Sequence, residues 1–209
     1  MLDLAIKHKE ELQKKLIDTW FTDKYKFVHA NTYCEEEKIE DDTWNKHQFV
    51  SIDKYGNVIG YIRYNVCRSD NSCNGLCIYN FSDNKVTFGM DLGHALQDIF
   101  DKFKFRKLTF CVAVGNPIEK SYDKMIKKYN GRIIGTWRKE FKCYDGEYYD
   151  KKSYEILRED YLESKKGAQK AFQTLSKKVT LKDRPITDTT SLIERLKKGE
   201  INYGSYRDL

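Results

Sequence analysis

The stretch Leu108-Thr-Phe-Cys-Val-Ala-Val114, followed by Gly115-Asn116-Pro117, decides the fold of this chain. The uncharged run 108–114 is typical of a strand that is buried on both faces near the middle of a sheet. Gly115 breaks the strand, and Asn116 and Pro117 have the residue types of an N-cap and a first helical residue. Residues 117–129 then carry apolar side chains at helical spacing. The stretch therefore predicts a buried strand that runs directly into a helix.

The segments on either side predict a mixed α/β sheet. On the N-terminal side we expect an amphipathic helix over 3–18, a hairpin over 48–66 and a loop over 68–75. Short strands over 76–81 and 86–90, then a helix through Leu96 and Phe103, lead to the central strand. On the C-terminal side, Asp145-Gly146 joins two long strands, 132–143 and 148–157, as a second hairpin. This order is typical of a sheet whose helices cross over between neighbouring strands.

The composition excludes several classes of protein. The 209 residues include 38 Lys and Arg against 32 Asp and Glu, a formal net charge of +6, and 40% of them are apolar. A real core can form, so the chain is not wholly disordered. No apolar run reaches about 18 residues and the first residues lack a signal peptide, so we expect a cytoplasmic protein without a membrane span. The Lys-, Tyr-, Asn- and Ile-rich usage is typical of an AT-rich genome, that of a low-GC bacterium or its phage.

The cysteines predict neither a disulfide framework nor a metal site. The chain has six of them, at Cys34, Cys67, Cys73, Cys77, Cys111 and Cys143. The chain is long for a disulfide scaffold and shows no export signal. The spacing from Cys67 to Cys77 is not that of a zinc knuckle, and no nearby histidine completes a ligand set. We therefore expect reduced thiols and no bound metal.

Three motifs, taken in order, resemble the GNAT superfamily of acyl-CoA-dependent N-acyltransferases. They are Met90-Asp-Leu-Gly93-His-Ala95 opening a helix, the buried strand ending in Val112-Ala-Val-Gly-Asn116-Pro117, and the helix closing in Tyr129-Asn-Gly131. The ending from Gly131 to Arg158 is similar to the branch that includes ribosomal-protein N-terminal acetyltransferases. The resemblance covers roughly residues 47–160. It implies an α/β fold with a mixed, mostly antiparallel sheet, splayed central parallel strands and flanking helices, here followed by a C-terminal helical extension.

The resemblance also implies a cofactor site for acetyl-CoA as the acyl donor. In the family, a loop of backbone N–H groups at a helix N-terminus binds the pyrophosphate, and two strands splay apart to hold the pantetheine arm. Carried over to this chain, the splayed strands would be 86–90 and 108–114. The cofactor-binding residues implied by the match are Gly89, Met90, Leu92, Gly93, His94, Ala95 and Asn116. Met90 departs from the Arg or Gln that usually opens the loop.

For catalysis, the resemblance implies direct transfer of the acyl group to an amine in a ternary complex. Tyr122 is the nearest candidate for the acid that protonates the departing thiolate, although it stands six residues after Asn116 where the family spacing is seven. A carboxylate is the expected base, and Asp91 and Asp83 are the candidates. The acceptor is a primary amine of a protein N-terminus, a lysine or a small molecule.

The C-terminal part lies beyond the usual end of the family. We expect one domain over 1–162 and a basic, partly helical extension over 163–209. Residues 165–184 hold seven basic residues against one acid, and Ser191 and Glu194 have the spacing of a capping box that opens a further helix. The extension suggests a contact with a protein partner or a homodimer rather than nucleic acid. The alternative function is therefore a catalytically inactive, phage-encoded GNAT-fold protein that binds a partner through this arm.

Overall fold

The computed structural model describes residues 1–29, 37–83 and 85–180, with side chains up to Lys170. The chain divides into two compact units, Met1–Lys166 and Gly167–Leu209. The first unit contains the whole sheet. In the second unit, the structure describes residues 167–180, the last part of a helix that begins at Arg158 in the first unit. The domain boundary expected between residues 162 and 163 therefore falls within this helix. The predicted helix opened by Ser191, along with Cys34, lies outside the described residues.

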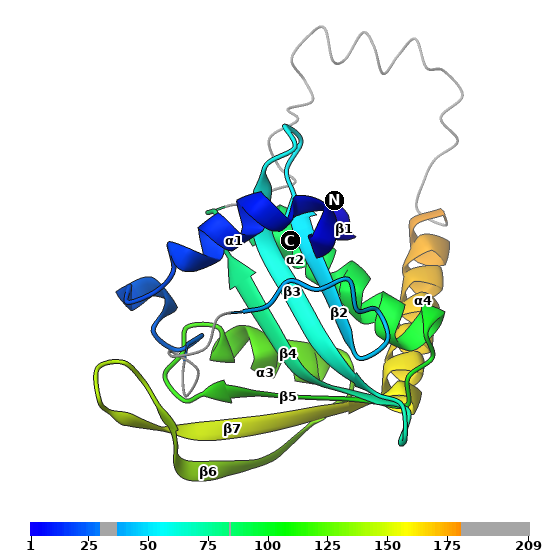
Figure 1. Ribbon diagram of the computed structural model, residues 1–209. Coiled ribbons are helices and arrows are strands. Elements are labelled where there is room, and N and C mark those ends of the chain that lie inside the picture. Colours follow the sequence, from blue (N-terminus) through cyan, green and yellow to red (C-terminus); the bar gives the residue numbers. More distant parts are fainter. Residues whose placement is uncertain (30–36, 84, 181–209) are drawn as a thin grey trace, which may run out of the picture. The chain divides into compact units, whose positions relative to one another are not determined.

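The first unit is built on a seven-stranded sheet in the order β1-β2-β3-β4-β5-β7-β6 (Figure 1). All neighbouring strands are antiparallel except β4 and β5, which are parallel. The strands and α-helices are β1 (Leu2–Leu4), α1 (Lys9–Ile17), β2 (Lys46–Ile52), β3 (Val58–Cys67), β4 (Ser72–Asn80), α2 (Lys85–Gln97), β5 (Lys107–Ala113), α3 (Glu119–Lys128), β6 (Arg132–Lys142), β7 (Tyr148–Leu157) and α4 (Arg158–Thr180). Short turns of 3-10 helix lie at η1 (Ala5–His8) and η2 (Asp23–Tyr25), and a π-helical turn, η3 (Asp98–Lys102), follows α2.

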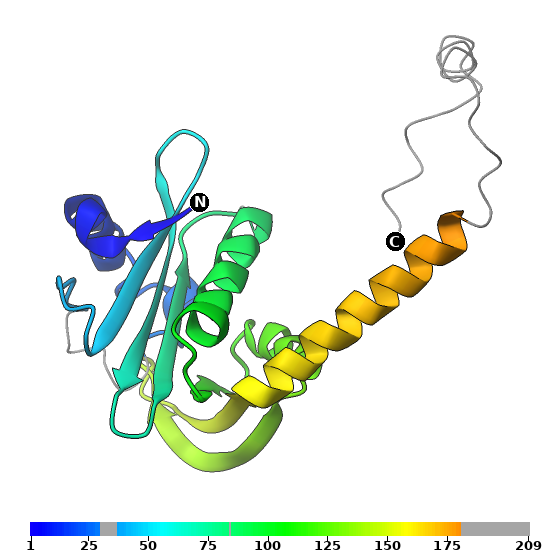
Figure 2. The same ribbon diagram turned by 90° about the vertical axis from the view of Figure 1, so that its right-hand side faces the viewer.

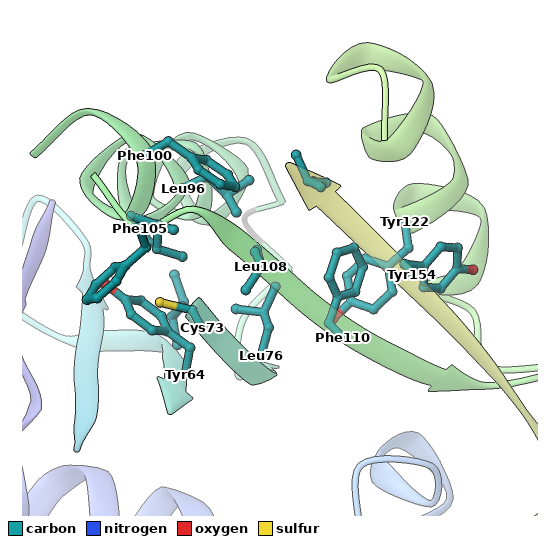
Figure 3. Packing of buried hydrophobic residues seen from close by; sticks show 14 of the residues in the cluster. Tyr64, Cys73, Leu76, Leu96, Phe100, Phe105, Leu108, Phe110, Tyr122 and Tyr154 are labelled. Carbon is teal, nitrogen blue, oxygen red and sulfur yellow. The ribbon is translucent and has the colours of Figure 1, made fainter. Parts of the chain in front are cut away.

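Helices cover both faces of the sheet, as the edge-on view makes plain (Figure 2). On one face, Leu12 and Leu16 of α1 pack on Val50, Tyr61 and Tyr79. The other face packs against α2 and α3 and holds the larger core cluster (Figure 3). We call these the α1 face and the α2 face. Alternation along the strands sends successive side chains to opposite faces, and this divides each strand between the two cores.

Both hairpins and the central strand are confirmed. β2 and β3 pair antiparallel around a turn in which Gly56 has φ +91°, and β6 and β7 pair around Gly146 at φ +84°. The uncharged run becomes β5, with Leu108, Phe110 and Val112 buried on the α2 face. The mixed sheet with flanking helices is thus the fold class that the sequence predicted.

The prediction of a strand over 86–90 was wrong, because these residues lie inside α2. Val86 and Met90 are 73% and 61% exposed, whereas Phe88 is buried. Phe88, Ala95 and Ile99 belong to one buried helical stripe that extends one or two turns earlier than we expected. The loop expected over 68–75 was also misplaced, since its second half opens β4. β4 is therefore the strand that precedes the crossover helix.

Two helix starts also differ from the prediction. The segment expected to be helical from residue 3 opens as β1, which pairs with β2, and α1 begins only at Lys9. The helix expected from Pro117 begins at Glu119, after a turn in which the Glu119 amide donates to the carbonyl of Asn116 at 2.9 Å. In both cases the residue types were those of a helix start, and strand pairing or a tight turn replaced the first helical turn.

Candidate active site

The central parallel strands separate shortly after they meet. β4 and β5 pair only through Ser72–Lys107, Cys73–Leu108 and Asn74–Thr109. Beyond these three pairs the described strands continue to Asn80 and Ala113 without a shared ladder, and Figure 1 shows their ends apart. The edges that the two strands turn toward each other therefore carry backbone donors and acceptors that the sheet does not use. This gap, the splay, is where the predicted opening lies, although it is formed by β4 and not by residues 86–90.

Tyr122 of α3 lies beside this splay. Its ring packs edge-on against Phe110 of β5, with centroids 5.0 Å apart, and Tyr154 stacks on Phe110 and completes a cluster of three rings (Figure 3). Burial, and then the thiols of Cys77 and Cys111, raise the pKa of the Tyr122 hydroxyl, so it is protonated at neutral pH. The two thiols belong to the two strands that separate. The tyrosine predicted from the motif therefore faces the gap between them.

The Tyr122 hydroxyl has no hydrogen-bond partner among the described residues. No fully enclosed side-chain N or O atom there lacks a partner, so this oxygen is not completely sealed off, although the residue as a whole is only 4% exposed. Its sequence neighbour Asp123 points elsewhere, accepting hydrogen bonds from Lys152 at 2.8 Å and from Tyr154 at 2.9 Å. The one-residue shift from the family spacing thus leaves a tyrosine, and not an aspartate, at the gap.

On the α1 face, a row of polar side chains crosses the sheet at the splay. Arg63 of β3 stands opposite Cys77 of β4 and donates from Nε to Glu37 at 2.9 Å. Tyr61 donates to the same carboxylate at 3.2 Å. Burial raises the pKa of the Cys77 thiol to about 11, so it is neutral. The Cys77 side chain on this side of the splay is therefore uncharged, and the Glu37–Arg63 ion pair lies next to it.

A bridging segment, residues 23–29, joins the far ends of the separating strands on this same face. The Tyr25 hydroxyl donates to the carbonyl of Asn80, the last residue of β4, at 2.9 Å. The Phe27 ring lies 3.9 Å from where a Cβ of Gly115, just after β5, would stand. Lys26 binds Asp145 at 2.9 Å and Tyr149 at 2.8 Å in the β6–β7 hairpin. These contacts close the wide end of the splay on the α1 face.

The expected pyrophosphate loop does not have the predicted geometry. Gly89, Met90, Leu92, Gly93, His94 and Ala95 all lie inside α2, which begins at Lys85. The amide groups of residues 92–95 are therefore past the first helical turn, whose amides are the free ones. A Cβ added at Gly89 or Gly93 would meet nothing within 4 Å, so neither glycine is required for a close approach within the chain. The free amides of the helix instead belong to its first turn, which follows β4 after a short connection.

Asp91 is not placed to act as a base. It is 3% exposed, and its carboxylate accepts from the Ser51 hydroxyl at 2.5 Å and pairs with the Met1 amine at 3.0 Å. His94, one turn further along, approaches the same carboxylate at 3.7 Å. This group ties α2 to β2 and the N-terminus rather than facing the splay. The other candidate, Asp83, is exposed in the connection before α2.

Asn116 lies in the turn directly after β5, as predicted. Its Oδ1 accepts a hydrogen bond from the amide of Ile118 at 3.1 Å, while Glu119 reaches back to the amide of Gly115 at 3.1 Å. Within the described parts of the chain, nothing accepts a hydrogen bond from the Asn116 Nδ2. The side chain therefore holds the strand-to-helix turn through its oxygen.

The described residues give no sign of a metal centre or a membrane span. No three His, Cys, Asp or Glu side chains among them are grouped to hold a metal ion, and the five cysteines described there are free. Within the same ranges, no helix is both long and apolar enough to cross a membrane.

Comparison with known proteins establishes the fold. No family model matches the chain, and no curated protein sequence matches it. A spermidine N-acetyltransferase from Vibrio cholerae, in complex with CoA and spermine, is 18% identical, with a TM-score of 0.59 over 78% of this chain and 97% of its own. A spermidine/spermine N-acetyltransferase from the same organism, in complex with manganese ions, is 19% identical, with a TM-score of 0.56 over 78% and 95%. The chain has the GNAT fold that its motifs resembled, and at these identities the likeness concerns the fold alone.

Proposed function

We propose that the protein is an N-acetyltransferase that moves the acetyl group of acetyl-CoA to a primary amine by direct transfer in a ternary complex. The observation that carries this proposal is the splay between β4 and β5, with the protonated hydroxyl of Tyr122 beside it and without a hydrogen-bond partner among the described residues. A pantetheine arm can bind between the strands as an added strand would, through the backbone groups that the sheet leaves unused. The CoA and spermine bound to the matched Vibrio cholerae enzyme support both the donor and the amine acceptor.

Chemistry at the splay follows from the positions of these groups. The amine nitrogen forms a bond to the thioester carbonyl carbon, the C–S bond breaks, and Tyr122 donates its proton to the departing thiolate. A backbone N–H at the strand edge can polarise the carbonyl oxygen as the C–N bond forms. We place the acceptor on the α1 face, beside the bridging segment. Most of the rate gain would come from holding the two substrates in line.

We place the pyrophosphate at the first turn of α2, in place of residues 92–95. The free amides of that turn and the positive end of the helix dipole favour a phosphate there. Lys85 and Val86 are both exposed at this point. The turn follows directly from the strand that lines the splay, so one ligand can contact both.

Calorimetry with acetyl-CoA tests the donor site. Val86→Asp adds a negative charge at the first turn, which suits the helix dipole but repels phosphate, and we expect it to weaken acetyl-CoA binding at least tenfold. Gly93→Glu is the matched control in the same helix, and it should leave the affinity within about twofold. If Gly93→Glu weakened acetyl-CoA binding and Val86→Asp did not, the pyrophosphate would instead bind at residues 92–95.

Release of free thiol from acetyl-CoA tests the reaction itself. The acceptors to compare are spermidine, a peptide with a free α-amine and a peptide with an internal lysine. We expect thiol release with at least one of them, and mass spectrometry should find a single added acetyl group on the acceptor. A protein that neither binds acetyl-CoA nor releases thiol would leave the non-catalytic alternative, in which the basic C-terminal extension binds a partner.

A further inference from the structure

His29, at the end of the bridging segment, has a chemical state that the mechanism above does not use. It is 6% exposed and stacks on Trp20, with ring centroids 4.4 Å apart. Its other neighbour is Tyr79 of β4, at 5.9 Å between centroids. Tyr79 faces the α1 side of the sheet, two residues beyond Cys77. The imidazole therefore lies on the acceptor side of the splay.

One hydroxyl fixes the tautomer of this imidazole. The Thr19 Oγ1 donates to the carbonyl of Leu16 at 2.6 Å, and the same Oγ1 lies 2.7 Å from the His29 Nε2. A hydroxyl has a single hydrogen to donate. Because that hydrogen is directed to Leu16, the His29 Nε2 must carry the proton and donate to Thr19. The Nδ1 is then the nitrogen with the lone pair.

The Nδ1 lone pair is not used by any described residue. In the described ranges of the chain it has no hydrogen-bond partner, and no enclosed side-chain nitrogen or oxygen there is left unsatisfied. Burial lowers the pKa of His29 below its usual value, so the ring is neutral at physiological pH. Among the described residues, the groups packed around the ring are Thr19 and Trp20, just after α1, and Tyr79 from β4. Among them only Tyr79 titrates, and burial raises its pKa, so it carries no charge that would shift the imidazole.

We propose that His29 is the general base of the transfer, and this rests on the proposed function. The ammonium of the acceptor gives one proton to Nδ1, and the free amine then forms the C–N bond as the C–S bond breaks. Tyr122 gives its proton to the thiolate and recovers one from the acylated nitrogen, so the net products are the amide, CoA thiol and one proton on His29. His29 lies on the α1 face and Tyr122 on the α2 face, so base and acid act from different sides of the sheet.

The variant His29→Gln removes the proposed base and keeps the hydrogen bond to Thr19. The glutamine amide can still donate to Thr19, but it provides no basic nitrogen. With spermidine as acceptor, we expect kcat to fall about 100-fold or more, while the KM for acetyl-CoA stays unchanged. In the pH–rate profile of the wild type, kcat should rise with pH through a pKa below the usual histidine value. This acid limb of the profile should be absent in the variant. An unchanged kcat and acid limb would overturn the proposal.

His47→Gln is the matched control for the loss of a buried histidine. Its two ring nitrogens are both occupied, by the Tyr64 hydroxyl at 2.9 Å and the Thr43 carbonyl at 3.0 Å. Burial lowers its pKa as well. We expect this variant to keep the kcat and the acid limb of the wild type, even where its thermal stability falls. If both variants lost the acid limb of the pH–rate profile, the limb would report on folding, and this result would overturn the assignment to His29.

A spectroscopic measurement on the wild type keeps the proposal testable without the variant. In a nitrogen NMR titration, His29 should stay neutral and protonated on Nε2 at pH 7, and Thr19→Val should relax that tautomer preference. An Nδ1-protonated ring, or a pKa above the free-histidine value, would overturn the proposal. If instead the wild type releases no thiol with any amine, the proposed function itself fails, and the two failures are distinguishable.

Discussion

Phe88 of α2 packs directly against Gly60 of β3, and no Cβ could stand between them. A side chain at residue 60 would overlap the Phe88 ring and approach the carbonyl oxygen of Tyr79 to 2.9 Å. Gly93, in the same helix as Phe88, is the opposite case, because a Cβ there would meet nothing within 4 Å. The close packing of α2 on the sheet therefore requires the glycine at residue 60 in β3, and not the glycine at residue 93 in the helix.

Alanine substitutions at these two glycines should have opposite effects. Gly60→Ala is expected to lower the free energy of unfolding by about 1–3 kcal/mol, because the ring or the strand must shift. Gly93→Ala should raise it by roughly 0.5–1 kcal/mol, because it removes a glycine from a helix interior. Urea unfolding of the two variants measures both changes. Destabilisation by Gly93→Ala, or weaker acetyl-CoA binding, would show that this glycine has the role first expected of it.

Removal of the Tyr122 hydroxyl should slow the reaction without weakening donor binding. For Tyr122→Phe we expect kcat to fall about 100-fold, in the range for loss of a general acid. Because burial raises the pKa of this hydroxyl, the wild type should show no alkaline loss of rate below pH 10 from its ionisation. Tyr154→Phe is the control, since its hydroxyl donates to Asp123 and not to the splay. Equal losses of kcat in both variants would contradict the acid role.

Asp91 should affect stability and not catalysis. Asp91→Asn removes the charge that pairs with the Met1 amine and weakens the bond from Ser51, so we expect a loss of about 1.5–3 kcal/mol in the free energy of unfolding. The kcat of the folded variant should equal that of the wild type. Asp83→Asn, at an exposed position, should change neither quantity. A loss of kcat in Asp91→Asn at unchanged stability would restore the carboxylate as a catalytic group.

The thiols at the splay should be unreactive in the folded protein. Burial raises the pKa of Cys77 to about 11, so about one molecule in a thousand carries the thiolate at pH 8. We expect iodoacetamide to label Cys77 only slowly in the native protein, although the residue as a whole is half-buried. In urea all six cysteines should react, as expected for reduced thiols. Rapid labelling of native Cys77, measured by peptide mass spectrometry, would mean that its thiol lies in polar, solvent-accessible surroundings.

The sequence predicted the central strand and both hairpins. These predictions are confirmed because each signal was local: an uncharged run for β5, and Asp145-Gly146 for the second hairpin. The crossover helix failed at its start, because Val86 to Met90 has a short alternating pattern that fits a strand as well as a helix. Only the burial of Phe88 against Gly60 decides between them, and that contact joins residues distant in sequence.

Most of the acceptor side was beyond prediction from sequence. His29 and Thr19 lie in a segment without strong periodicity, and their role depends on a tautomer set by a third residue, Leu16. The i, i+3 spacing of Leu16 and Thr19 at a helix end was a weak signal for that hydrogen bond. Glu37 and Arg63 come together only through the register of β3. The pairing of Asp91 with Ser51 and the Met1 amine could not be predicted either, because these partners are distant in sequence.

The short ladder between β4 and β5 has a consequence for cooperativity. In the described sheet, the ladder between a four-stranded half, β1 to β4, and a three-stranded half, β5, β7 and β6, has only three residue pairs. Side-chain packing on the α2 face and the bridging segment on the α1 face also connect the two halves. We expect amide hydrogen exchange to resolve the halves as separate opening units. A ligand that fills the splay with strand-like hydrogen bonds should merge the two units, so that protection gained at one half appears equally at the other.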